Sequence, residues 1–221
     1  MLAAVSCRHL RCRSPRRDDF AESDRRVEGN GRQPVAAPIR GRAAELKVID
    51  ALIADIAGRR GSVLVIEGPP GIGKSRLLTE VIRGAENAGV RTLLGEAFEY
   101  QQTVPFFALF MATLRAEQPV GDPDALRRLG GSADLRYWVV HDLRAAIHAA
   151  ASTTPLAIVL EDIHWADNAT LLALRSLTAP GADAPVLWVL SLAAKAHGGP
   201  YIIECTIIDS TIAMKISSGP P

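Results

Sequence analysis

The sequence predicts an α/β fold of three layers, in which helices cover both faces of a mainly parallel sheet. Short, mainly apolar runs at 62–67, 156–160 and 186–190 are typical of strands buried on both faces. Between them lie longer segments whose apolar residues recur every three or four positions, as in amphipathic helices. Strands that alternate with helices indicate βαβ units, and therefore parallel strands.

Glycine and proline mark the boundaries of these elements. Gly58 and Gly61 separate the first helix from the first strand, and Gly89 ends the second helix. Pro105 is suited to begin a helix, because the first turn does not use its missing N–H group. In chain order, the sequence predicts a helix over 46–56, a strand over 62–67, a helix over 74–87, a strand near 90–97, helices over 105–114 and 135–151, a strand over 156–160, a helix over 169–177 and a strand over 186–190.

Composition divides the chain into three parts. Residues 1–38 are rich in Arg, Ser, Asp, Gly and Pro, and we expect a disordered arm because they bury too little apolar surface to offset the entropy of ordering. Residues 39–192 form the predicted domain. In residues 193–221 Leu and Arg disappear and Ile clusters, which indicates a tail derived from truncation or a frameshift. The alternative is a native sheet edge, with residues 201–209 as a strand. The sequence leaves open whether the sheet lacks its last strand and its lid.

The overall charge excludes several partners. The 221 residues include 25 basic and 24 acidic side chains, so the net charge of +1 creates no field that attracts nucleic acid or an anionic membrane. The predicted domain shows neither a basic face nor a helix-turn-helix, and we expect no direct DNA binding. No apolar run reaches the roughly 18–20 residues that cross a bilayer, and no secretory signal is visible. We therefore expect a cytoplasmic protein without a membrane span.

The strongest chemical signal is Gly-Pro-Pro-Gly-Ile-Gly-Lys-Ser at residues 68–75, a complete G-x-x-x-x-G-K-S loop between a predicted strand and a predicted helix. Its glycines allow the backbone to fold around phosphates and direct N–H groups at them, and the helix N-terminus adds its positive dipole end. We expect Lys74 to reach the β- and γ-phosphates and Ser75 to offer a hydroxyl to Mg²⁺. The predicted ligand is therefore ATP with Mg²⁺, bound by Gly68, Pro69, Gly71, Ile72, Gly73, Lys74, Ser75 and Arg76.

Two adjacent acids, Glu161 and Asp162, directly follow the apolar run at 156–160. The carboxyl end of a buried parallel strand lies at the sheet edge where ligands bind, beside the phosphate loop. This pattern is similar to a Walker B element, in which one acid belongs to the Mg²⁺ shell and the other orients or deprotonates the attacking water. We expect Asp162 to join Ser75 as a metal ligand, and Glu161, Asp162 and Lys74 to be catalytic. The pattern leaves open which acid has which role.

The segment His-Trp-Ala-Asp follows these acids at 164–167. His164 is a candidate sensor of the γ-phosphate, and the alternative is a loop histidine with an ordinary hydrogen bond. Asp167 precedes a predicted helix and is expected to cap its first turn.

Three motifs in this order resemble the AAA-type ATPase domain of STAND signalling proteins. They are Ile-Arg-Gly-Arg-Ala-Ala-Glu-Leu at 39–46, the loop at 68–75, and Val-Leu-Glu-Asp-Ile-His-Trp-Ala-Asp at 159–167. In particular the sequence is similar to the large ATP-binding regulators of the LuxR type, and more distantly to the ATPases of origin-recognition proteins. The resemblance covers residues 39–192 and implies a P-loop NTPase fold, a role in transcription regulation and self-association in the ATP-bound state.

The same resemblance implies that Arg40, Gly41 and Arg42 lie near the base or ribose. The family usually has an acid at the position of Ala43, and an arginine that senses the γ-phosphate where this chain continues from Ser191 to Lys195. In that family an arginine finger from a lid or from a second subunit also stabilises the transition state, and the absence of such a finger costs about 10³ to 10⁵ in rate. We therefore expect the nucleotide switch of a truncated regulator, with slow or no ATP hydrolysis. The alternatives are a competent P-loop ATPase or small-molecule kinase, and a non-functional fragment.

Overall fold

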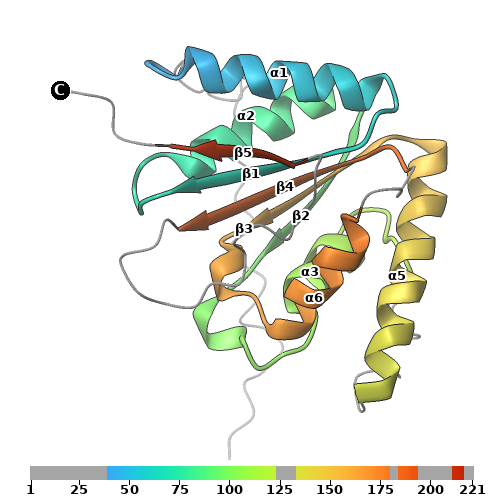
Figure 1. Cartoon of the computed structure of the whole chain (residues 1–221). Helices are drawn as coiled ribbons and strands as arrows, with labels where there is room; N and C mark the ends of the chain where they lie inside the picture. Colours follow the sequence, from blue (N-terminus) through green and yellow to red (C-terminus); the bar gives the residue numbers. More distant parts are fainter. Residues whose placement is uncertain (1–38, 123–132, 180–183, 194–210, 217–221) are drawn as a thin grey trace, which may run out of the picture. The chain divides into compact units, whose positions relative to one another are not determined.

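The computed structural model describes residues 39–122, 133–179, 184–193 and 211–216. These residues form a parallel sheet with the strand order β2-β3-β4-β1-β5, covered by helices on both faces (Figure 1). The predicted three-layer α/β fold is confirmed. The strands are β1 (Ser62–Gly68), β2 (Arg91–Glu96), β3 (Leu156–Glu161), β4 (Val186–Ala193) and β5 (Thr211–Lys215).

Helices α1 and α2 cover one face of the sheet, and α3, α5 and α6 cover the other (Figure 1). Their order along the chain matches the order predicted from apolar spacing. The helices are α1 (Ala43–Ala57), α2 (Lys74–Asn87), α3 (Phe107–Leu114), α5 (Ala133–Thr153) and α6 (Asn168–Leu177), with single 3₁₀ turns at η1 (Glu99–Gln101) and η2 (Ile163–Trp165).

Each central strand supplies side chains to two separate apolar cores. In β3, Ile158 packs with the α3–α5–α6 side, while its neighbours Ala157 and Val159 pack with the α1–α2 side. Successive side chains of a strand point to opposite faces, so a strand covered on both faces needs apolar residues at every position. This requirement explains the continuous apolar runs in the sequence.

Strand β5 lies in the segment that composition alone places outside the domain. It pairs in parallel with β1, and the N–H of Ile216 donates to the carbonyl of Glu67 at 2.7 Å. Met214 and Ile216 alternate inward onto the α1–α2 side and are 8% and 3% exposed. The sheet therefore continues beyond β1 by one strand, β5. Residues 211–216 belong to the domain.

Other expectations fall on parts of the chain that are not described. The disordered arm at 1–38 and the candidate strand at 201–209 lie outside the described residues. Within the described ranges, no helix combines the length and the hydropathy that crossing a bilayer requires.

Candidate functional site

The glycine-rich loop connects β1 to α2 at the carboxyl end of the sheet. Gly71 and Gly73 have φ angles of +77° and +98°, which side chains rarely adopt, so glycine is needed there for backbone conformation. Gly68 is needed for space, because a Cβ at this position would lie 2.8 Å from Cγ2 of Ile72 and 3.1 Å from the carbonyl oxygen of Ile216. These requirements restrict the backbone conformation of the loop. The segment after β5, at Ile216, contributes to the restriction.

Lys74 is folded back against this loop. Its side chain is 9% exposed, and Nζ donates to the carbonyl oxygens of Gly68 at 3.1 Å and Pro69 at 3.3 Å. Helix α2 begins directly after Gly73, with no side-chain cap and no acidic residue in its first turn. The uncapped first-turn N–H groups and the lysine concentrate positive charge at one point, which suits an anion.

The two acids at the end of β3 occupy different positions. The hydroxyl of Ser75 donates to Oε1 of Glu161, which brings the start of α2 and the end of β3 together. Asp162 has a φ of +53°, and its backbone N–H donates to Oγ of Ser191 on β4 at 3.1 Å. The structure therefore places the hydroxyl of Ser75 against Glu161, one of the two acids whose roles the sequence leaves open. The left-handed backbone at Asp162 follows directly after the last residue of β3.

His164 lies close to Asp162, and the charge of Lys74 also acts on it. Its Nδ1 accepts a hydrogen bond from the N–H of Ala193 at 3.4 Å and lies 3.8 Å from Oδ1 of Asp162. Burial lowers the pKa of this imidazole, with a further contribution from Lys74 and an opposing one from Asp162. A lowered pKa favours the neutral ring, in which an accepting Nδ1 leaves the proton on Nε2.

Two residues of the site were missed by sequence reasoning, Glu96 and Ser191. Glu96 ends β2 in register with Glu161, and burial together with the charges of Glu161 and Asp162 raises its pKa. Ser191 lies on β4, the other neighbour of β3. Both residues lie near the carboxyl ends of predicted strands, which is the feature that could have identified them. That feature identifies them only when the order of the strands in the sheet is known.

The two arginines of the Arg-Gly-Arg segment before α1 differ in whether they contact the loop. Gly41 has a φ of +72°, and Arg40 is exposed. Arg42 reaches the loop instead, where its guanidinium donates to the carbonyl oxygen of Ile72 at 3.2 Å. Among the expected ligands on the loop, Pro69 is exposed, and Arg76 follows Ser75 on α2.

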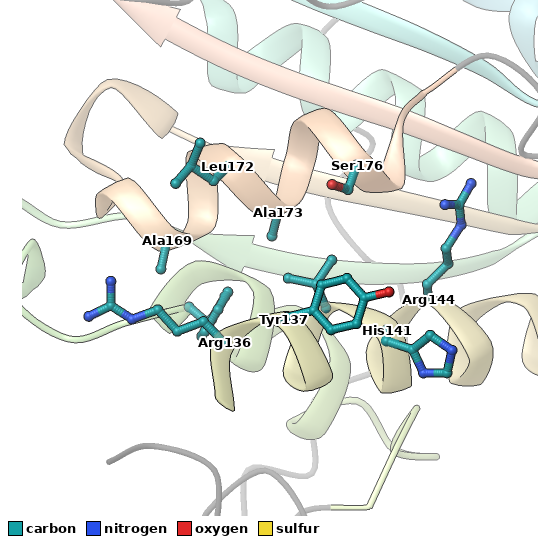
Figure 2. A pocket seen from close by; sticks show the side chains of 10 residues that line it. Arg136, Tyr137, His141, Arg144, Ala169, Leu172, Ala173 and Ser176 are labelled. Atoms are coloured by element: carbon teal, nitrogen blue, oxygen red, sulfur yellow. The ribbon is translucent and has the colours of Figure 1, made fainter. Parts of the chain in front are cut away.

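A separate cavity of about 300 Å³ lies between α5 and α6. Figure 2 shows Tyr137 between Arg136 and Arg144 on α5, facing the α6 residues Ala169 and Ala173. None of the loop residues or the two acids of β3 lines this cavity. It is therefore distinct from the site at the carboxyl end of the sheet.

Comparison with known proteins agrees with this fold. A family model described as the AAA ATPase domain matches residues 38–189. Cdc6p from Pyrobaculum aerophilum has a similar structure, with a TM-score of 0.54, 18% identity, and coverage of 82% of this chain and 47% of that chain. The structure of Drosophila ORC bound to DNA gives a TM-score of 0.49 and 17% identity, over 80% of this chain and 43% of that one.

These structural similarities concern the fold. The chain spans less than half of the length of each of these two structures. No curated protein sequence matches the chain.

Proposed function

Because the chain belongs to the AAA ATPase domain family, we propose that residues 68–75 bind ATP together with Mg²⁺ and that the domain acts as a nucleotide switch. The observation that carries this proposal is the position of Lys74, held by two loop carbonyls at the uncapped start of α2. A buried lysine at a helix N-terminus is costly without an anion, and a phosphate chain supplies that charge.

The residues present fit the ligand. The positive φ angles of Gly71 and Gly73 allow successive backbone N–H groups to face one anion, as phosphate-binding loops require. Lys74 has three N–H donors and exchanges its two carbonyl partners for phosphate oxygens without leaving the loop. The bound nucleotide supplies the phosphoryl group, and Mg²⁺ neutralises its charge.

For the metal, the Ser75–Glu161 pair favours Glu161 as the carboxylate that shares Mg²⁺ with Ser75. Asp162 then becomes the acid that faces water, next to His164. His164 also supports the proposed switch. Its Nδ1 accepts a hydrogen bond from the N–H of Ala193, so its Nε2–H is left to donate to a phosphate oxygen.

We propose slow hydrolysis, since the sequence continues from Ser191 to Lys195 where the family that it resembles has an arginine that senses the γ-phosphate. Charge stabilisation of the transition state then rests on Lys74 and the loop amides. The resemblance to STAND regulators of the LuxR type supports a role as the switch part of a longer regulator, which self-associates when ATP is bound.

Calorimetric titration with Mg-ATP tests the proposal on the wild type and on Lys74→Ala. We expect saturable binding by the wild type and a loss of at least about tenfold in affinity in the variant, because a charge-assisted contact disappears. Lys47→Ala is the matched control, since Lys47 is an exposed lysine of α1 that is remote from the loop in sequence. A folded wild type that does not bind ATP, or equal binding by Lys74→Ala, would contradict the proposal.

The metal assignment has its own test. We expect Glu161→Gln to weaken the Mg²⁺ dependence of ATP binding, because the carboxylate beside Ser75 is lost, while Asp162→Asn retains it. Titrations with ATP in the presence of Mg²⁺ and of a chelator measure this dependence. The opposite ranking of the two variants would restore Asp162 as the metal ligand.

A further inference from the structure

The guanidinium group of Arg42 connects the start of α1 to the phosphate loop. Its Nη1 donates to Oε1 of Glu45 at 2.8 Å, and its Nη2 donates to the carbonyl oxygen of Ile72 at 3.2 Å. The side chains of Arg42 and Glu45 are only 17% and 19% exposed. The hydrogen bond from Arg42 is the main cause of a lowered pKa of Glu45, so the carboxylate is ionised near neutral pH and holds the arginine in one orientation.

The hydrogen bond from Arg42 to Ile72 lies in the part of the loop whose backbone conformation requires glycine. Ile72 lies between Gly71 and Gly73, whose φ angles are both positive. The carbonyl of Ile72 and the N–H of Gly73 belong to one trans peptide unit and point in opposite directions. A hydrogen bond that holds this carbonyl toward Arg42 therefore turns the N–H of Gly73 away from Arg42, and it also fixes the residue that precedes Lys74.

We propose that Arg42 is a positioning residue that arranges the phosphate loop before the ligand arrives, and that it acts through Ile72 and not through the base or ribose. The inference rests on the proposed function of the loop as a phosphate site. It revises the role that the resemblance implies for Arg42. Its consequence is that Arg42 sets the affinity for the phosphate chain, whatever group that chain carries.

Two other roles for Arg42 make different predictions. A contact with the base or ribose would affect ATP and leave inorganic tripolyphosphate unchanged. A simple attraction between charges would survive in Arg42→Lys, because the charge is kept. Lysine lacks the planar fork of donors, so one ammonium group cannot replace both contacts of Arg42.

The experiment measures displacement of a fluorescent ATP analogue by ATP and by tripolyphosphate. It uses the full chain as wild type, Arg42→Gln and Arg42→Lys, and circular dichroism confirms the fold of each. Arg83→Gln is the matched control, since Arg83 and Glu80 form an ion pair of the same i, i+3 spacing on α2. We expect both Arg42 variants to lose about tenfold in affinity for both competitors, the size of one lost charge-assisted hydrogen bond.

Each contrary result has one meaning. A loss for ATP alone would show a base or ribose contact, and full affinity in Arg42→Lys would show a charge effect; both overturn the inference. A wild type that binds ATP but not tripolyphosphate would overturn it as well, because a loop arranged beforehand binds the phosphate chain by itself. Failure of the wild type to bind the ATP analogue would instead refute the proposed function.

Discussion

The charges of Glu161 and Asp162 act on a third carboxylate, that of Glu96, at the carboxyl end of the sheet. Burial is the main reason for the raised pKa of Glu96, and the two neighbouring negative charges add to it. A raised pKa means that the folded state carries the ionised form at a cost. Glu96 is an exposed residue, so solvent screens its charge and the cost to the fold at neutral pH is small; the cost disappears as the pH falls and the carboxyl is protonated.

Glu96→Gln is accordingly expected to raise the midpoint of urea unfolding at pH 7 in the absence of metal, because the substitution removes a disfavoured charge. The gain should shrink as the pH falls toward the ordinary glutamate pKa, where the wild-type group also becomes neutral. Glu117→Gln, at an exposed site, serves as the control. A loss of stability at pH 7 in Glu96→Gln would show that the carboxylate makes a favourable contact.

Local spacing was enough to predict the residues of the loop and the two acids. Gly68, Lys74 and Ser75 follow one another along the chain, and Glu161 ends a run whose apolar character identifies a buried strand. Glu96 and Ser191 could not be found in this way, because their proximity to Glu161 and Asp162 depends on β2 and β4 flanking β3. The contact of Arg42 with Ile72 likewise depends on the packing of α1 beside the loop.

Helix α6 begins after the N-cap residue that the sequence predicted, Asp167. The carboxylate of Asp167 also accepts a second backbone hydrogen bond. Oδ1 of Asp167 accepts from the N–H of Thr170 at 2.9 Å and from the N–H of Phe106 at 3.1 Å. Phe106 has a φ of +60° at the start of α3, a conformation that is rare for such a residue. Asp167 therefore joins the starts of two helices at a buried position.

Asp167→Ala is expected to lower the free energy of unfolding by about 2 kcal/mol, because a cap is lost and a buried N–H is left without an acceptor. Asp167→Asn keeps an oxygen acceptor and should retain most of this stability. Asp50→Ala, at an exposed position of α1, is the control. Chemical denaturation measures all three. Equal stability of Asp167→Ala and Asp50→Ala would show that the two hydrogen bonds contribute little.

Among the α-helices and strands that the structure describes, only β5 lies outside the sequence prediction. Its five residues follow a segment whose composition differs from that of the domain, and such a short strand shows no more than two inward positions. The pattern alone does not distinguish it from a tail. Its place becomes clear only from its pairing with β1 and from the burial of Met214 and Ile216.

For the whole molecule, removal of residues 211–221 tests whether β5 is part of the folded domain. We expect a loss of about 3–5 kcal/mol in the free energy of unfolding, since two large buried side chains and one strand pairing disappear. A chain that ends at residue 216 is the matched control, because it retains β5. If both shortened chains were equally stable to urea, β5 would contribute nothing to the fold.

The strand order also has a consequence for synthesis on the ribosome. Of the strands that the structure describes, β1 is the first to emerge, yet both of its neighbours, β4 and β5, come from the far end of the chain. A protein rich in such distant pairings has a high contact order and folds slowly. The apolar edges of β1 therefore stay unpaired during most of translation, when binding by a chaperone would protect the nascent chain from aggregation.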